Sequence, residues 1–244
     1  MEPCVFFVDP MSYNNLSIYD WNLIQNLKAK VYFFGSNKYD YKELNVNSNL
    51  IYNYNSIKFK LLKAFVYIIN NIKLLFYVIK LKPQIIHFQW MKFPTFDIIF
   101  VKIIRFISKR TKIVLTAHNF LPHNSGEKYL KQYKKIYSLV DKIIVHSKNT
   151  KEQISEIINT SEKINVIVHG ILKIENDEKL ITKAQKEIIE KYNLKNKTIF
   201  LNIGQIHSYK GTDVLIDAWN SASKLNQNDD LVYPGMYSTV LIKE

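Results

Sequence analysis

The sequence predicts an α/β protein with a doubly wound, mostly parallel sheet, followed by the start of a second domain of the same kind. Short apolar runs alternate with longer helical patterns from the N-terminus to about residue 170. Most of these runs lack polar alternation, which is typical of strands that are buried on both faces. Several runs end at a polar residue, and in a parallel sheet such ends meet at one edge.

The N-terminal segment reads as a βαβ unit. The apolar run at 4–8 ends at Asp9, and a second run at 31–34 ends at Gly35. Between them, apolar residues at helical spacing predict a helix that Asp20 caps. A connection of this kind between parallel strands should be right-handed. A further short strand is predicted at 50–54.

The stretch 59–81 is long and apolar enough to raise the question of a membrane span. Lys63, Lys73 and Lys80, together with Asn70 and Asn71 near its centre, argue against a span. We expect a basic helix that packs on the sheet. A helix lying in a membrane interface is the alternative.

Polar residues recur where the later strands end. Strands are expected at 84–88, 112–117, 142–145 and 164–168, with helices at 96–110, 126–140 and 150–158, the last opened by a capping box at Thr150. Four histidines lie at the ends of these strands, and three other polar residues share the same edge: His87, His118, His146 and His169, with Asp9, Gln89 and Asn119. They predict a polar crevice. A zinc site is the more specific alternative, but the sequence contains no spacing of His or Cys residues that is typical of zinc ligands.

The composition shifts after residue 172, which divides the chain into predicted domains 1–172 and 173–244. A charged helix at 173–197 precedes a strand at 198–203 and a helix at 213–222. Between strand and helix lies a loop from Gly204 to Gly211 that contains Lys210. Backbone amides, a lysine and a helix N-terminus suit a phosphate group. The loop is neither a Walker A sequence nor GxGxxG.

The net charge of +13 is unevenly distributed. From Lys58 to Arg110 there are eleven Lys and Arg against one acid, Asp97. This segment favours an anionic partner such as anionic lipid or a phosphorylated substrate, and no nucleic-acid-binding motif accompanies it. A merely solvated basic face is the alternative. The single Cys4 and the lack of a signal peptide predict a cytoplasmic protein. The basic segment extends this prediction to a peripheral position on the cytoplasmic face of the membrane.

Five motifs in order resemble the GT4-type glycosyltransferases of the GT-B fold: PQIIHFQW, VLTAHNFLPH, VDKIIVHS, INVIVHGI and GQIHSYKGTDVLIDAW. The resemblance implies an acceptor-side and a donor-side Rossmann-like domain. His118 matches the cleft histidine near the transferring sugar, the predicted catalytic residue. Lys210, with Gly204 and Gly211, matches the site of the donor diphosphate. Relatives usually carry an arginine in this loop, where the chain has Gln205 and His207.

The resemblance implies a retaining transferase that moves a sugar from a nucleoside-diphosphate sugar to a lipid-linked or polysaccharide acceptor in cell-surface glycan synthesis. It requires no metal and no cofactor. The Glu-x7-Glu element of the family has no counterpart in this sequence, so we expect a truncated chain that is inactive by itself. The alternative is a non-catalytic remnant or binding module that keeps the acceptor crevice and the basic face. An epimerase on the same fold is a third reading.

Overall fold

The computed structural model describes residues 2–122, 126–170, 178–195, 198–201, 211–222, 229–234 and 239–242. The chain forms two compact units, Met1–Lys173 and Ile174–Glu244. The first unit carries most of the residues that the sequence singles out.

The first unit is built on a seven-stranded sheet in the order β3-β2-β1-β4-β5-β6-β7. Every pairing between neighbouring strands is parallel. The strands are β1 (Cys4–Asp9), β2 (Lys30–Ser36), β3 (Asn47–Tyr52), β4 (Ile85–Phe88), β5 (Lys112–Ala117), β6 (Lys142–Val145) and β7 (Ile164–Val166). The order reverses between β1 and β4. In open α/β sheets, ligands bind beyond the strand ends at such a switch point.

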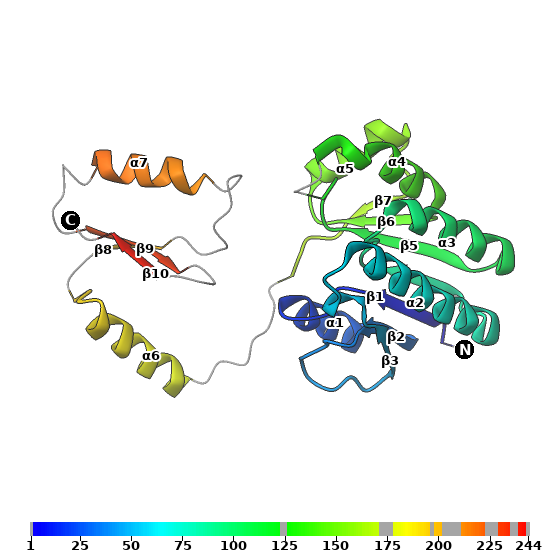
Figure 1. Ribbon diagram of the computed structural model, residues 1–244, viewed down its shortest axis with the longest axis horizontal. Coiled ribbons are helices and arrows are strands. Elements are labelled where there is room, and N and C mark those ends of the chain that lie inside the picture. Colours follow the sequence, from blue (N-terminus) through cyan, green and yellow to red (C-terminus); the bar gives the residue numbers. More distant parts are fainter. Residues whose placement is uncertain are drawn as a thin grey trace. The chain divides into compact units, whose positions relative to one another are not determined.

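Helices cover the two faces of this sheet unequally (Figure 1). One face carries α2 (Lys60–Leu81), α3 (Pro94–Ile107), α4 (Leu130–Leu139) and α5 (Lys148–Ile158), whose buried side chains share one apolar cluster with the strands. The other face carries α1 (Asn15–Asn26), which contributes Ile24 to a smaller cluster with Phe7 and Phe33. Two short 3-10 turns, Tyr54–Ser56 and Gly126–Tyr129, complete the unit.

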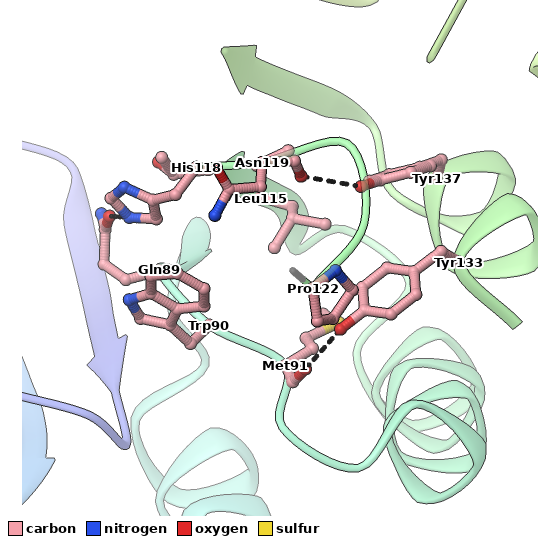
Figure 2. Close-up of a pocket in the computed structure, with 11 residues that line it drawn as sticks. Gln89, Trp90, Met91, Leu115, His118, Asn119, Pro122, Tyr133 and Tyr137 are labelled. Carbon is pink, nitrogen blue, oxygen red and sulfur yellow. Dashed lines mark hydrogen bonds between the residues drawn. The ribbon is translucent and has the colours of Figure 1, made fainter. Parts of the chain in front are cut away.

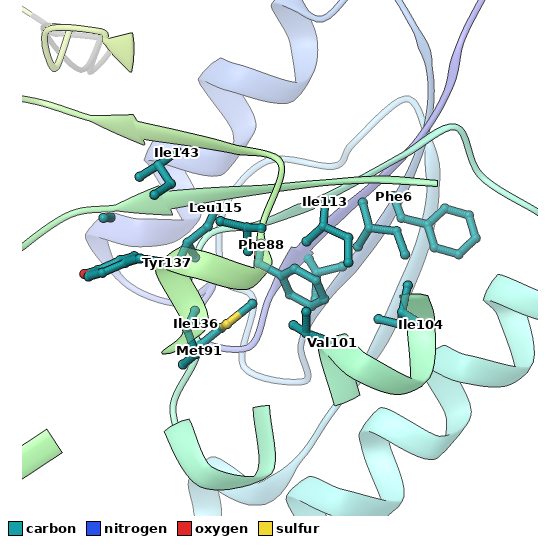
Figure 3. Packing of buried hydrophobic residues seen from close by; sticks show 14 of the residues in the cluster. Phe6, Phe88, Met91, Val101, Ile104, Ile113, Leu115, Ile136, Tyr137 and Ile143 are labelled. Atoms are coloured by element: carbon teal, nitrogen blue, oxygen red, sulfur yellow. The ribbon is translucent and has the colours of Figure 1, made fainter. Parts of the chain in front are cut away.

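The larger cluster is the main core of the unit (Figure 3). Phe6, Ile86 and Ile113 project from adjacent strands to the helix-covered face and are fully buried there. Each large apolar side chain buried in this way contributes about 1.5–3 kcal/mol of transfer free energy. The alternate residues of β4 to β6 point to the opposite face, and there Val114 and Ile144 are only half-buried and line a cavity.

Two predicted helix starts were wrong. Asp20 does not cap α1, because the helix begins at Asn15 and buries Asp20 within its second turn. The cap of α5 is Ser147 and not Thr150, since the Ser147 side chain accepts a hydrogen bond from the Thr150 amide at 3.1 Å. At α1 the residue before the helix, Asn14, makes no side-chain cap hydrogen bond, whereas at α5 the cap lies three residues before the predicted one.

The second unit contains α6 (Glu178–Lys191), β8 (Thr198–Leu201), α7 (Thr212–Ala222), β9 (Asp229–Pro234) and β10 (Thr239–Ile242). Its sheet has the order β10-β9-β8. Strands β8 and β9 pair in parallel, as expected for a βαβ unit at the start of a second Rossmann-like domain, whereas β10 pairs antiparallel with β9.

Candidate functional site: a histidine-lined crevice

The predicted crevice residues lie along the carboxyl edge of the parallel sheet. Asp9 is the last residue of β1, and Gln89, His118 and His146 are the first residues after β4, β5 and β6. Because these four strands are neighbours, their ends bring residues far apart in the sequence to one edge of the sheet. His87 departs from the prediction, since it lies within β4 rather than beyond its end.

A chain of hydrogen bonds joins the ends of β4 and β5. The His118 Nε2 atom lies 3.2 Å from Gln89 Oε1, and the Gln89 Nε2 atom lies 3.2 Å from His87 Nε2 (Figure 2 shows the first contact). His87 Nε2 is also 2.8 Å from Thr116 Oγ1. An amide oxygen can only accept, so the first contact requires a proton on His118 Nε2. The Nδ1 atom of the neutral His118 ring is then a hydrogen-bond acceptor.

Aromatic rings fix the plane of His118. The Trp90 ring stacks on it with centroids 4.6 Å apart and planes 7° apart (Figure 2). The Tyr19 ring of α1 meets it edge-on at 5.4 Å, and His146 lies at 5.1 Å. With one ring nitrogen held by Gln89 and one ring face covered by Trp90, His118 has a defined orientation before any ligand arrives.

His146 and His169 extend this group along the edge. Their ring centroids are 5.2 Å apart, and Tyr19 contacts both rings. The His146 Nδ1 atom lies 2.8 Å from the Ile167 carbonyl oxygen, and its Nε2 atom is buried without a hydrogen-bond partner among the described residues. His169 lies three residues beyond β7 and is exposed. The structure therefore gathers His118, His146 and His169 around one tyrosine.

The two inner histidines are uncharged at neutral pH. Burial, together with a smaller effect of the neighbouring His146, His169 and His87, lowers the pKa of His118 to about 3. Burial also lowers the pKa of His87 to about 4. A neutral imidazole can accept or donate a hydrogen bond but cannot supply a proton as an acid at pH 7. The arrangement therefore suits orientation of a polar ligand rather than acid catalysis.

Two cavities open beside these rings. A small one of about 40 Å³ is lined by residues that include Gln89, Trp90, His118 and Asn119 (Figure 2). A larger one of about 330 Å³ lies on the open face of the sheet. Its lining is largely apolar, with Thr116 and the imidazoles of His87, His146 and His169 among it. A volume of this order is within the range of small-molecule sites.

Asp9 lies beneath this rim and lines neither cavity. It is buried, as is Asp20 of α1, and the two carboxyl groups face each other. The Met11 amide donates to Asp9 Oδ1 at 2.6 Å, whereas both Asp20 oxygens lack other hydrogen-bond partners among the described residues. Burial raises the pKa of Asp9 to about 7, and burial together with the charge of Asp9 raises the pKa of Asp20. Two adjacent buried carboxyl groups cannot both ionise at low cost, so the raised pKa values favour a protonated carboxyl group in this pair.

The predicted donor-side residues are described only in part. Gly204 and Lys210 lie outside the described residues. Gly211 immediately precedes α7 with φ +65°, a conformation that favours glycine. Across the described part of the chain, no group of three or more His, Cys, Asp or Glu side chains could hold a metal ion. The catalytic, diphosphate-binding and acceptor roles of all these residues stay predictions.

The sequence did not identify four residues that contact the predicted site residues. Tyr19 and Trp90 contact His118, Asp20 contacts Asp9, and Thr116 contacts His87. Asp20 gave a signal, because it falls in helical register with the buried Ser17 and Ile24. Trp90 and Thr116 were close to named residues in the sequence, yet nothing in the sequence showed that their side chains meet His118 and His87. Tyr19 left no signal, since its contacts come from distant strands.

Known proteins match the chain at the level of fold and family. The chain is similar to a crystal structure of Anabaena Alr3699/HepE in complex with UDP-glucose, with 14% identity and a TM-score of 0.60, covering 95% of this chain and 60% of that chain. It is also similar to a glycosyltransferase from Rickettsia africae ESF-5, with 21% identity and a TM-score of 0.57, covering 96% and 60%. A third similar structure is α,α-trehalose 6-phosphate synthase from Burkholderia multivorans, with 11% identity and a TM-score of 0.62, covering 96% of this chain and 63% of that chain.

These likenesses confirm the predicted GT-B-like fold. The chain spans about 60% of the length of these solved structures. No curated protein matches the chain. The family model described as Glycosyltransferase Family 4 matches residues 21–171, which is more than half of the sequence and includes every crevice histidine. The chain therefore belongs to Glycosyltransferase Family 4.

Proposed function

We propose that this chain forms the acceptor side of a retaining glycosyltransferase. The enzyme moves a sugar from a nucleoside-diphosphate sugar to a hydroxyl group of a lipid-linked or polysaccharide acceptor, in cell-surface glycan synthesis, without a required metal or cofactor. Membership of Glycosyltransferase Family 4 supports the reaction class. The crevice on the carboxyl edge of the sheet supports the position of the acceptor.

The observation that best supports this proposal is the fixed orientation and neutral charge of His118. Gln89 fixes the proton on its Nε2 atom, and Trp90 fixes its ring plane. Its pKa of about 3 keeps the ring uncharged at neutral pH. A neutral imidazole with a fixed orientation suits a hydrogen bond to a sugar hydroxyl. It positions the reacting groups, which is a large share of catalysis in a transfer between two bound substrates.

The departing diphosphate carries the charge that develops during transfer. In this proposal, Lys210 and the backbone amides near Gly211, at the N-terminus of α7, stabilise that charge. UDP-glucose is a reasonable first donor to test, because the similar Anabaena structure contains it. The identity of the sugar and the nucleotide is part of the test.

Two other functions share this fold. Putative and established UDP-N-acetylglucosamine 2-epimerases also resemble the chain, at TM-scores of 0.58 and 0.51. The family match favours a transferase over an epimerase. A binding module that retains only the crevice is the second candidate, and the largely apolar cavity beside His146 and His169 favours it as far as ligand binding alone is concerned.

A chimera tests the proposal. We expect the 244-residue chain alone to release no measurable UDP from UDP-glucose and to bind it weakly at best, because transfer requires both substrates to be held. Appending the donor domain of a full-length family member after Trp219 should produce UDP release, and His118→Ala should lower its rate by about tenfold or more. Ser138→Ala, at an exposed position of α4, is the matched control.

Each function gives a different result. An acceptor glycan that binds the unmodified chain, with no sugar transfer by the chimera, would favour the binding module. Conversion of UDP-N-acetylglucosamine to its 2-epimer would indicate the epimerase. Full activity in the His118→Ala chimera would remove His118 from the mechanism. Turnover by the unmodified chain that His118→Ala abolishes would show that the chain needs no appended domain.

A further inference from the structure

The outer face of α2 is apolar and exposed. Its large side chains Leu61, Phe65, Ile69, Ile72, Phe76 and Ile79 are 89%, 59%, 36%, 56%, 61% and 59% exposed. At about 100° per residue, these six positions fall within about 80° of one another around the helix axis. A surface helix of a soluble domain normally presents polar residues there. The exposed apolar face of α2 is hereafter the α2 stripe.

The inner face of α2 holds the helix firmly on the sheet. Tyr67, Leu74 and Val78 are buried in the main core. The Tyr67 hydroxyl donates to Asp97 Oδ1 at 2.6 Å, and the Tyr52 hydroxyl donates to Asn71 Oδ1 at 3.2 Å. By length and composition alone, Lys60–Leu81 is the one described helix that could cross a membrane. Crossing would break these buried contacts, so the helix can meet a membrane only with its outer face.

Helix α3 extends the same surface. It lies beside α2 and packs on the same face of the sheet (Figure 1). Its outward positions Ile99, Ile103 and Phe106 are 50%, 37% and 80% exposed. Both helices therefore carry exposed apolar side chains on the same side of the sheet.

Positive charge borders this surface, and exposed negative charge is missing from it. Lys73 and Lys80 are exposed on one flank of the α2 stripe, and Lys102 is exposed on α3. Asp97 is the only acid between Lys58 and Arg110, and it is buried beneath the helices. Exposed hydrophobic side chains flanked by lysines match the interface of an anionic bilayer, where the rings and aliphatic chains enter the headgroup region and the ammonium groups meet anionic lipids.

We propose that the α2 stripe and the outer face of α3 dock the protein on an anionic membrane surface, with α2 lying parallel to the bilayer. This inference does not depend on the proposed transferase activity. A second copy of the chain is the competing occupant of the surface. The lysines argue against it, because a symmetric contact would place like charges opposite each other at its edges.

Docking of this kind has two separable parts. The lysines attract anionic lipid, and that attraction weakens as the screening length falls from about 10 Å at 0.1 M salt to about 3 Å at 1 M. The inserted apolar side chains contribute a part that salt does not weaken. Binding should therefore weaken as salt rises, and the binding that remains at high salt should depend on the α2 stripe.

Vesicle co-sedimentation of the 244-residue chain tests the proposal. Vesicles of phosphatidylcholine mixed with phosphatidylglycerol should bind the chain about tenfold more tightly than phosphatidylcholine alone. The double variant Phe65→Glu, Phe76→Glu should lower binding to the mixed vesicles by about tenfold or more at both salt concentrations. Lys73→Ala with Lys80→Ala should lower binding mainly at low salt.

A matched control makes the same change in charge elsewhere. Leu180→Glu with Ile188→Glu replaces two exposed apolar residues of α6 and should leave vesicle binding unchanged. All these positions are exposed, so circular dichroism should report the same fold for each variant. A Phe76→Trp variant should show a fluorescence blue shift on the mixed vesicles that is absent in phosphatidylcholine alone.

The following results would overturn the proposal. The chain fails to bind the mixed vesicles, or the Phe65→Glu, Phe76→Glu variant binds them as tightly as the unmodified chain. Equal loss of binding in the α6 control would show that net charge alone decides. If analytical ultracentrifugation shows a dimer that the stripe variant dissociates while vesicle binding persists, the surface belongs to a second copy.

Discussion

The charge state of His118 is the feature of the crevice most open to measurement, and replacement of its stacking partner perturbs it directly. In the Trp90→Leu variant, the ring that covers one face of His118 is gone, and water reaches the imidazole. Burial is the main cause of the low His118 pKa, so its removal should raise that pKa towards the ordinary value of 6.5.

The size of the effect follows from the two pKa values. With a pKa of about 3, His118 is about 1% protonated at pH 5, whereas a ring with a pKa of 6.5 is about 97% protonated at the same pH. A pH of 5 therefore separates the two states without strongly acidic conditions.

The assay is the pH titration of the imidazole Cε1–H resonances by NMR from pH 8 to pH 5, with His118 assigned by its absence in His118→Ala. In the native chain this resonance should stay constant, and in Trp90→Leu it should move with pH. Trp21→Leu removes a tryptophan of α1 that does not contact His118 and should behave as the native chain. A native His118 resonance that titrates near pH 6.5 would refute the proposed neutral, oriented ring.

Two further predictions concern stability. Burial raises the pKa of Asp97 to about 7, so the native state holds a proton that the unfolded state has released, and stability falls as pH rises from about 4 through 7. Urea unfolding measures the free energy of unfolding at pH 5 and at pH 8. The loss of stability between these two pH values should be about 3 kcal/mol smaller in Asp97→Asn than in the native chain. An equal loss in both proteins would contradict the raised pKa of Asp97. Gly35→Ala should destabilise the chain by about 1–3 kcal/mol, because a Cβ atom there would overlap the Phe33 ring and lie 2.8 Å from Ser12 Oγ. Thermal unfolding measures this loss, and an unchanged melting temperature would show that the Phe33 ring moves aside at no cost.

The sequence predicted the architecture of the first unit well, because each buried parallel strand is a short apolar run with a marked end. Strands such as Lys112–Ala117 lie where the pattern put them, and the residues that follow reach one edge. Helix starts were predicted less well. Asp20 looked like a cap and is a buried residue of α1, because its burial depends on β1, which the local sequence around the helix does not contain.

What the sequence determined by itself was periodicity, strand ends and charge, since these are properties of neighbouring residues. They placed His118 and Gln89 at strand ends and lysines along Lys58–Arg110. Only the tertiary structure decided which side chains meet and which are left uncovered. The stacking of Trp90 on His118 depends on the pairing of β4 with β5, and the exposure of the α2 stripe depends on which face of the helix the sheet buries. Burial and contact are relations between distant segments, and for that reason no local pattern encodes them.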